Sequence, residues 1–339
     1  MDDMTVMDAA AIDAAVRDIF KHSVIWDGHS GFMPDPAADL HELSRWRDAG
    51  VNYLSVDVGF DALDWHSAIR TIAAFRRFIA RNGDKYALVA TVHDIHRAKA
   101  EGKMAITFDL EGANALDGRI EMVELYHRLG VRQILFAYNR NNLAGGGCHD
   151  ADTGLTRFGR DMVDEMNRLG MFIDVTHCGY RTSMDAMEYS SQPVIFSHSN
   201  PRALKEHERN ISDEQARACA ATGGLVGVVG LENFLGDDAR PETIAEHICY
   251  WADLIGPEHV GISLDHSFEV DVPHAHAMFE TFPEYWPLSQ GYGKKDRQQA
   301  HPRNLAEIAA ILLKRGMAVR DVEAIFGGNF MRLAARIWR

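Results

Sequence analysis

The chain has few cysteines, a deficit of basic residues and no apolar amino terminus. Its four cysteines, with no Cys-x-x-Cys pair, exclude a disulfide framework and favour a reducing compartment. Lysine and arginine number 35 against 49 acidic residues, and the formal charge of −14 disfavours nucleic acid and anionic membranes as partners. The first twenty residues carry five aspartates. We therefore expect neither a signal peptide nor a membrane span there, and we predict a cytoplasmic protein.

The chain also lacks a linker. No Pro/Ser-rich stretch, charge block or low-complexity tract interrupts its 339 residues, of which 46% are hydrophobic, so we expect one domain spanning 1–339. Within it, short and nearly continuous apolar runs recur. Such runs are typical of strands that are covered on both faces, as in parallel sheets. The eight runs are 24–30, 51–58, 104–112, 133–139, 171–177, 194–199, 225–231 and 259–266.

Stretches of helical periodicity alternate with these runs. In 63–81 and 158–169, for example, the apolar residues fall on one helical face. Eight strand-then-helix units predict an α/β fold of the (β/α)8 or TIM-barrel type. We further expect an N-terminal helix at about 8–21, a long lid-like loop at about 267–303 and closing helices at the carboxyl terminus.

Polar and ionisable residues stand at the carboxyl ends of the apolar runs. In a barrel those ends meet at one rim, and a buried charge is unfavourable unless it is paired or bound to a metal. Histidine nitrogen and carboxylate oxygen suit zinc and similar divalent ions. One buried histidine alone is commonly a hydrogen-bonded core residue, but three histidines and a glutamate at matching strand ends indicate a metal site. The four candidates are His29, Glu111, His177 and His198.

Asp265 ends the eighth run and is expected to face the same centre. Its carboxylate could take a proton from a water activated by a metal ion and pass that proton to a leaving amine. The alternative is a structural carboxylate that accepts a hydrogen bond from a loop amide.

Five short motifs occur in order along almost the whole chain. They are WDGH at 26–29, DLEG at 109–112, IDVTH at 173–177, VIFSHS at 194–199 and GGNF at 327–330. Any one of them is weak, but five in register are fairly specific. Together they resemble the membrane (renal) dipeptidase family of the amidohydrolase superfamily.

The resemblance implies a paired metal centre, usually zinc, in which a glutamate bridges the two ions. The residues that match the ligands of one ion are Glu111, His177 and His198. His29 matches a ligand of the other ion, but Gly31 stands where the family has an aspartate. We therefore expect one tightly bound zinc ion, and a second ion that is weak, absent or held by another group such as Asp27.

The resemblance also implies roles for residues around the metals. Arg209 matches the arginine that binds the terminal carboxylate of the substrate, and a guanidinium can do so with two parallel hydrogen bonds. Tyr138 stands in place of a histidine that supports the scissile carbonyl, and it could donate a hydrogen bond to a developing oxyanion. Ser267 replaces a second aspartate of the family pattern.

These residues predict a metal-dependent hydrolase that cleaves an amide or peptide bond in a small, carboxylate-bearing substrate. One alternative is a related hydrolase or lyase acting on an acyl-amino acid, a lactone or another carboxylate, which the changes at Gly31, Tyr138 and Ser267 favour. The other is a non-catalytic binding barrel. From the resemblance we also expect a homodimer.

Overall fold

The computed structural model of the chain describes residues 7–30, 39–267, 278–294 and 296–339. Two predictions fall partly or wholly elsewhere. Gly31 lies outside the described residues, and so does 268–277 of the expected lid-like loop. The described helices include none that is long and apolar enough to cross a lipid bilayer.

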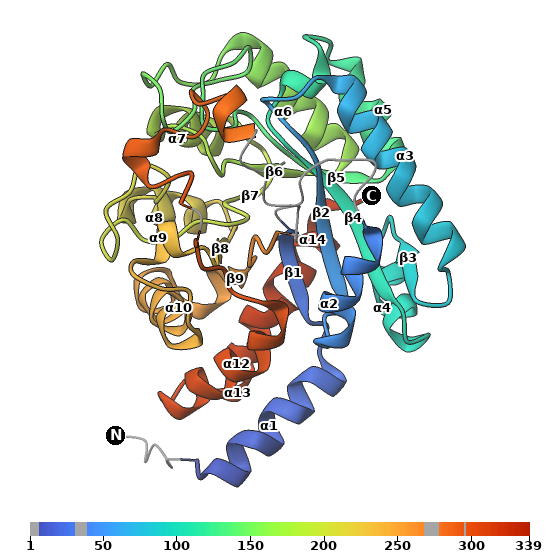
Figure 1. Cartoon of the computed structure of the whole chain (residues 1–339), viewed down its shortest axis with the longest axis vertical. Coiled ribbons are helices and arrows are strands. Elements are labelled where there is room, and N and C mark those ends of the chain that lie inside the picture. Colours follow the sequence, from blue (N-terminus) through green and yellow to red (C-terminus); the bar gives the residue numbers. More distant parts are fainter. Residues whose placement is uncertain (1–6, 31–38, 268–277, 295) are drawn as a thin grey trace.

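Parallel strands form the centre of the described structure (Figure 1). Seven strands make one sheet in the order β1-β2-β4-β5-β6-β7, and β3 pairs with the start of β4 on the edge that β5 uses further along. Strands β8 and β9 pair with each other. Their bounds are β1 Trp26–Ser30, β2 Tyr53–Phe60, β3 Tyr86–Leu88, β4 Met104–Glu111, β5 Val131–Leu135, β6 Phe172–Asp174, β7 Val194–Ile195, β8 Val226–Val228 and β9 Val260–Ile262.

Backbone contacts join the two sheets into a ring. Next to β7, the amide of Phe196 donates to the carbonyl of Leu225 at 3.0 Å, and an isolated bridge links Phe196 to Val226. At the other seam, the amide of Asp265 donates to the carbonyl of His29 at 3.2 Å. With β3 set aside, the eight remaining described strands each coincide with or overlap one predicted run, and the (β/α)8 barrel is confirmed.

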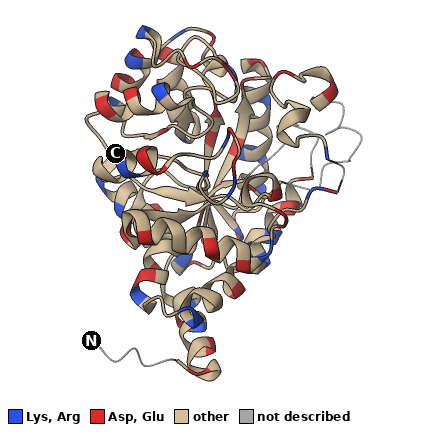
Figure 2. Ribbon diagram, turned by 90° about the vertical axis from the view of Figure 1, so that its left-hand side faces the viewer, with Lys and Arg blue, Asp and Glu red and all other residues tan. Residues whose placement is uncertain are grey.

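Helices surround the strands (Figure 1). Helix α3 begins after the capping side chain of Asp64, and α6 ends at Gly170, which has a left-handed backbone. The helices are α1 Ala9–His22, α2 Ser44–Asp48, α3 Trp65–Arg81, α4 Val92–Ala100, α5 Glu121–Leu129, α6 Arg157–Leu169, α7 Tyr180–Tyr189, α8 Asp213–Ala221, α9 Glu232–Leu235, α10 Pro241–Ile255, α12 Leu305–Lys314, α13 Val319–Glu323 and α14 Asn329–Ile337. Figure 2 shows acidic and basic residues interspersed over these outer elements.

Aromatic side chains fill the amino-terminal end of the barrel. Trp26 of β1 stacks on Tyr53 of β2 and, with ring centroids 5.3 Å apart, on Phe330 of α14. Trp338, just after α14, packs against the same cluster. Since this end is closed by packed side chains, the opposite end, where the strands finish, is the one that can hold a site.

Candidate active site

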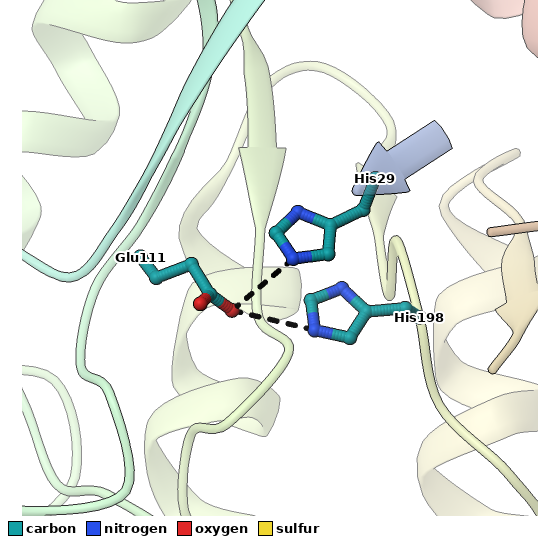
Figure 3. A group of neighbouring side chains, drawn as sticks. All are labelled: His29, Glu111 and His198. Atoms are coloured by element: carbon teal, nitrogen blue, oxygen red, sulfur yellow. Dashed lines mark ion pairs between the residues drawn. The ribbon is translucent and has the colours of Figure 1, made fainter. Parts of the chain in front are cut away.

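Four predicted residues meet at one carboxylate oxygen. Oε1 of Glu111, the last residue of β4, lies 3.1 Å from Nε2 of His177, 3.4 Å from Nε2 of His198 and 3.7 Å from Nε2 of His29. His29 belongs to β1, while the other two histidines follow β6 and β7. Figure 3 shows the rings of His29 and His198 side by side, both aiming Nε2 at the carboxylate. All four side chains are buried.

The other nitrogen of each histidine ring is held by a neighbouring side chain. Nδ1 of His29 lies 3.0 Å from Oδ1 of Asp109, and Nδ1 of His198 lies 2.7 Å from the hydroxyl of Ser197. Such outer contacts orient metal-binding histidines and fix which nitrogen faces the ion.

The contact of His177 shows this most directly. Its Nδ1 lies 2.6 Å from Oδ1 of Asn139, whose amide nitrogen donates to the carbonyl of Tyr285 at 2.8 Å. That second bond sets the orientation of the amide, so Nδ1 of His177 must be the donor. In the neutral ring, Nε2 then presents a lone pair to the centre.

The centre therefore collects acceptors that need a cation. Nε2 of His29 and Oε1 of Glu111 are buried without a hydrogen-bond partner, and Nε2 of His177 lies only 3.2 Å from Nε2 of His198. One ligand atom from each of His29, Glu111 and His198 fits within 4.8 Å of the others. Unsatisfied buried nitrogen and carboxylate atoms of this kind match the donor set of zinc and similar divalent ions.

The pKa values of these four residues also reflect the need for positive charge at the centre. Burial, with smaller effects of nearby positive groups, lowers the pKa of His177 and His198 well below the usual range. Burial acts in the same direction on His29, but the carboxylates of Asp109 and Glu111 outweigh it, and the pKa of His29 is raised. Burial also raises the pKa of Glu111 to about 8. Without a metal, protons thus supply part of the positive charge.

Two further carboxylates border the cluster. Oδ1 of Asp265, just beyond β9, lies 3.5 Å from Nε2 of His29. Asp57 of β2 lines the same cavity, and burial followed by repulsion from Glu111 raises its pKa. Asp265 thus stands where the sequence predicts it, within reach of a group bound at the centre.

Three residues at the strand ends have a left-handed backbone. The φ angles are +61° at Asn139, +64° at His177 and +53° at Asp265. This region is uncommon for residues other than glycine, although Asn, Asp and His enter it more readily than most. The strained backbone coincides with the side chains that surround the centre.

A cavity opens above the centre. It measures about 660 Å³ including its open mouth. Its floor includes Glu111, His177 and Asp265, and its apolar wall includes Phe60 and Trp286. Part of that wall comes from the described portion of the expected lid-like loop.

Tyr138 lines this cavity beside the metal-binding histidines. Its ring centroid lies 4.3 Å from that of His177, and its hydroxyl accepts a hydrogen bond from the indole of Trp286 at 3.0 Å. Its backbone amide donates to Oδ2 of Asp61 at 2.9 Å. The other oxygen of Asp61 accepts from the amide of Asn114, so one buried carboxylate ties the loop after β5 to the loop after β4.

Arg209 contacts the backbone of His198, next to the centre. Its guanidinium is buried and donates to the carbonyl of His198 at 2.7 Å and to the hydroxyl of Ser199 at 3.1 Å. It lines a neighbouring cavity that shares His177 with the first one. Its Nε is buried without a hydrogen-bond partner among the described residues. The role predicted for Arg209 in substrate binding stays a prediction.

Asp27, which was considered above as a substitute metal ligand, instead makes hydrogen bonds that hold the fold together. Its Oδ2 accepts from the indole of Trp46 at 2.9 Å and its Oδ1 from the amide of Leu264 at 2.9 Å. Both oxygens are thus already engaged at the seam between β1 and β9. Ser267 lines the cavity, with its amide donating to Gln299 at 3.0 Å.

Three residues that border the site, Asp61, Asp109 and Arg297, were not predicted from the sequence. A signal existed for Asp109, because residues two apart on a strand face the same side and Glu111 was already a candidate. Asp61 follows a strand without a recognisable motif, and Arg297, which lines the cavity, lies in a stretch without periodicity.

Comparison with known proteins places the chain among dipeptidases. The family model for membrane dipeptidase (peptidase family M19) matches residues 14–275. A Schizosaccharomyces pombe protein described as an uncharacterized dipeptidase is 33% identical over 227 residues, which are 63% of this chain but only 54% of that protein. The dipeptidase tcpJ of Claviceps purpurea is 29% identical, over 97% of this chain and 74% of its own length.

One solved structure matches this chain over nearly the full length of both proteins. An amidohydrolase from Pseudomonas aeruginosa superposes with a TM-score of 0.86 at 29% identity, covering 95% of this chain and 99% of its own. The similarity therefore includes the barrel and its closing helices, well beyond the strands that carry the site.

Proposed function

The chain belongs to the membrane dipeptidase family, and from that membership we propose that its metal centre hydrolyses the peptide bond of a small, carboxylate-bearing dipeptide. A dipeptidase-like metallohydrolase is the activity that the family supports. The observation that carries the proposal is the approach of three imidazole Nε2 atoms to one buried carboxylate oxygen. A binding barrel that had lost its chemistry would have no need of this costly set of unsatisfied acceptors.

The residues that would hold the metal are Glu111, His177, His198 and His29. When bound, a divalent ion supplies Lewis acidity, lowering the pKa of a water and polarising a carbonyl. We propose zinc, because the donor set is nitrogen and carboxylate oxygen. We further propose that Glu111, His177 and His198 hold one ion tightly and that the ion beside His29 is weaker.

The reaction divides its proton transfers among the chain's own residues. Asp265 accepts the proton of the attacking water as that oxygen bonds to the carbonyl carbon, and it then gives the proton to the amine as the carbon–nitrogen bond breaks. Tyr138 keeps its proton and donates a hydrogen bond from its hydroxyl to the carbonyl oxygen while negative charge develops there. Burial and the Glu111 carboxylate raise the pKa of Tyr138, so this hydroxyl keeps its proton at neutral pH.

Further proposals concern the residue that binds the substrate, the location of the protein and its dimerisation. For the carboxylate of the substrate, the family match proposes Arg209, although its guanidinium already contacts His198 and Ser199. We propose a cytoplasmic location from the small number of cysteines in the sequence. The proposed homodimer rests on the family alone.

Turnover of a defined panel tests the proposal. Metal-stripped protein, resupplied with zinc, is assayed against dipeptides of L,L and L,D configuration and against N-acyl amino acids, with bound metal measured alongside. We expect dipeptide hydrolysis that a chelator abolishes and zinc restores. Hydrolysis of the acyl-amino acids alone, or no turnover with the metal site filled, would contradict a dipeptidase.

Asp265→Asn tests the proposed proton transfer. The substitution keeps the size of the side chain but removes its basic oxygen, so we expect kcat to fall by about 10²–10⁴-fold while the protein stays folded. Asp161→Asn on the exposed face of α6 is the matched control and should leave kcat unchanged. Undiminished kcat in the Asp265 variant would show that another group moves the proton.

A further inference from the structure

Two tyrosine hydroxyls belong to residues that line the active-site cavity, those of Tyr138 and Tyr292. Tyr138 follows β5, and Tyr292 lies in the described portion of the lid-like loop. A tyrosine hydroxyl can donate one hydrogen bond and accept others, and its fixed partners decide which of the two it offers to a ligand. The proposed chemistry uses Tyr138 but assigns no role to Tyr292.

A hydrogen-bonded chain fixes the direction of the Tyr292 hydroxyl. Nδ1 of His149 lies 2.7 Å from Oε2 of Glu208, and Nε2 of His149 lies 3.1 Å from the hydroxyl oxygen of Tyr292. The side chain of His149 is only 1% exposed, and burial lowers its pKa despite the carboxylate beside it, so the ring is neutral at neutral pH. Since a carboxylate only accepts, Nδ1 carries the hydrogen, and Nε2 accepts from the Tyr292 hydroxyl.

The two hydroxyls therefore present opposite polarity to the cavity. The indole of Trp286 donates to the oxygen of Tyr138 at 3.0 Å, which leaves the hydrogen of Tyr138 for a ligand. Tyr292 gives its hydrogen to His149, so it meets a ligand as an acceptor. A peptide bond suits this pair, because its carbonyl oxygen accepts and its N–H donates.

Polar contacts hold the backbone just before Tyr292. Because a carbonyl only accepts, Nε2 of His207 donates to the carbonyl of Gln290 at 2.9 Å. The side-chain amide of Asn233 donates to the carbonyl of Gly291 at 3.0 Å. The acceptor oxygen thus has a fixed place in the cavity wall, as the positioning of a reacting group requires.

Tyr292 lies on the side of the cavity toward Arg209. The ring of His207, two residues before Arg209, meets the ring of Tyr292 edge to face with centroids 6.0 Å apart. Burial raises the pKa of Tyr292, while the positive charges of Arg209 and Arg297 act in the opposite direction. These cations repel a free ammonium group, which the acidic floor of the cavity attracts. The donor that suits Tyr292 is therefore a neutral N–H.

A bound dipeptide would place such an N–H beside Tyr292. Its free carboxylate and the N–H of its scissile bond are attached to the same Cα atom, and the family match proposes Arg209 for that carboxylate. An acceptor on the side of Arg209 is thus within reach of this N–H. With the N–H directed to Tyr292, the lone pair that develops on the nitrogen stays free for the proton that Asp265 delivers.

Resting on the proposed dipeptide hydrolysis, we propose that Tyr292 accepts a hydrogen bond from the N–H of the scissile peptide bond. His149 and Glu208 are positioning residues that keep the oxygen of Tyr292 available to the substrate. Tyr292 is thus a further catalytic residue, supplied by the lid-like loop. An ester in place of the peptide bond has no such hydrogen, and its oxygen would face a lone pair of Tyr292.

Two substrates that differ only at this atom test the proposal. Wild-type protein and Tyr292→Phe are assayed with zinc on alanyl-phenylalanine and on its depsipeptide, in which an ester oxygen replaces the N–H. We expect Tyr292→Phe to lower kcat/KM for the peptide about 5- to 20-fold and to leave that of the depsipeptide within about twofold. The peptide-to-ester ratio cancels the different reactivities of the two bonds, and it should fall accordingly.

Variants of His149 test the positioning role. In His149→Leu the Tyr292 hydroxyl loses its acceptor and can turn its hydrogen toward the substrate, so the peptide-to-ester ratio should fall although the hydroxyl remains. His149→Gln, whose side-chain oxygen can still accept, should keep part of the ratio. A merely structural role for His149 would lower the rates on both substrates together.

A matched control removes a hydroxyl elsewhere. Tyr189 of α7 is exposed and donates to Asp164 at 3.1 Å, so Tyr189→Phe should leave both rates unchanged. Bound zinc and thermal unfolding of Tyr292→Phe should equal those of the wild type.

Binding of two inert mimics gives a readout that needs no turnover. Both are tetrahedral phosphorus analogues of alanyl-phenylalanine, one with NH and the other with oxygen in place of the scissile nitrogen. We expect wild-type protein to bind the NH form about 10- to 100-fold more tightly, because the oxygen of the other form faces an acceptor. In Tyr292→Phe this difference should shrink to within about threefold.

The possible failures are distinguishable. If zinc-loaded wild type cleaves the depsipeptide but no dipeptide, the proposed function fails, and the two mimics decide the role of Tyr292 separately. If dipeptides are cleaved and Tyr292→Phe keeps the peptide-to-ester ratio of the wild type, the inference about Tyr292 is wrong. An equal fall for both substrates would also overturn it, because Tyr292 would then act through packing and not through the N–H.

Discussion

At the scale of single residues, the two sides of the metal centre differ in the side chain that contacts Nδ1 of the histidine. His29 is backed by the carboxylate of Asp109, whereas His177 is backed by the neutral amide of Asn139. A carboxylate partner increases the basicity of an imidazole ligand more than an amide does. The affinity of the ion beside His29 therefore depends on Asp109, particularly if Gly31 leaves that ion with one ligand fewer.

Two variants should separate the two ions. Asp109→Asn is expected to lower the affinity for the ion beside His29 by about 10–100-fold, and Asn139→Gly should do the same for the ion of His177. Titration of metal-stripped protein with zinc against a competing chelator measures both affinities. If both variants weakened the same ion, the assignment of Asp109 and Asn139 to different sides of the centre would be wrong.

At the scale of elements, the sequence predicted the strands and their polar ends but not every strand. Eight apolar runs correspond to barrel strands because burial on both faces leaves a continuous hydrophobic signal. Strand β3 was missed, since only one of its three residues is buried and its alanine and leucine suit a helix equally well. Its pairing with β4 is a tertiary contact that no local pattern encodes.

The geometry of the barrel also explains which residues of the candidate site could be predicted from the sequence. His29, Glu111, His177 and His198 could be proposed because barrel geometry brings strand ends together, and the structure does bring them together. Arg297 could not be found in this way. Its place depends on a ladder between 298–300 and the loop after β8, which joins segments more than sixty residues apart.

Close approach of strands predicts where the barrel tolerates no side chain. A Cβ on Gly227 of β8 would lie 1.9 Å from the carbonyl oxygen of Ser197, next to His198. We expect Gly227→Ala to force β7 and β8 apart, lowering the free energy of unfolding by about 1–3 kcal/mol or more and weakening zinc binding. Denaturant unfolding and metal titration measure the two effects.

Gly83 provides the matched control. A Cβ there would come no closer than 3.8 Å to another atom, so Gly83→Ala should change the free energy of unfolding by no more than about 0.5 kcal/mol. A Gly227 variant as stable as this control would mean that the contact between β7 and β8 is looser than described.

At the scale of the whole molecule, buried ionisable groups link stability to pH and to metal. Burial raises the pKa of Asp27 and of Asp61 to about 7, and that of Glu111 to about 8, all above the values of the unfolded chain. The folded protein thus holds these protons more tightly, and the free energy of unfolding falls as pH rises toward those values. His29, with a raised pKa, acts in the same direction above its unfolded value of 6.5.

The lowered pKa values of His177 and His198 act only at lower pH. These groups bind protons in the unfolded chain below about 6.5, so their contribution is constant above it. Between pH 6.5 and 8, metal-stripped protein should therefore lose stability, by up to about 1.4 kcal/mol per pH unit for each group still titrating. Zinc replaces the protons on Glu111 and His29, so the zinc-loaded protein should lose less.

Denaturant unfolding at several pH values, in chelator and in zinc, checks this dependence. The two curves should diverge as pH rises from 6.5 to 8. Stability of the stripped protein that is flat or rising over this interval would contradict the burial of these carboxyl groups in their protonated form.

The left-handed backbone at Asn139, His177 and Asp265 sets a limit for anyone who wishes to make this protein more heat-resistant. Glycine would adopt the backbone at each of these positions with less strain, and that relief is the gain such an exchange offers. Each such gain would delete a side chain that surrounds the centre. Substitutions meant to raise thermal stability should therefore be made far from this rim of the barrel, for instance in the outer helices.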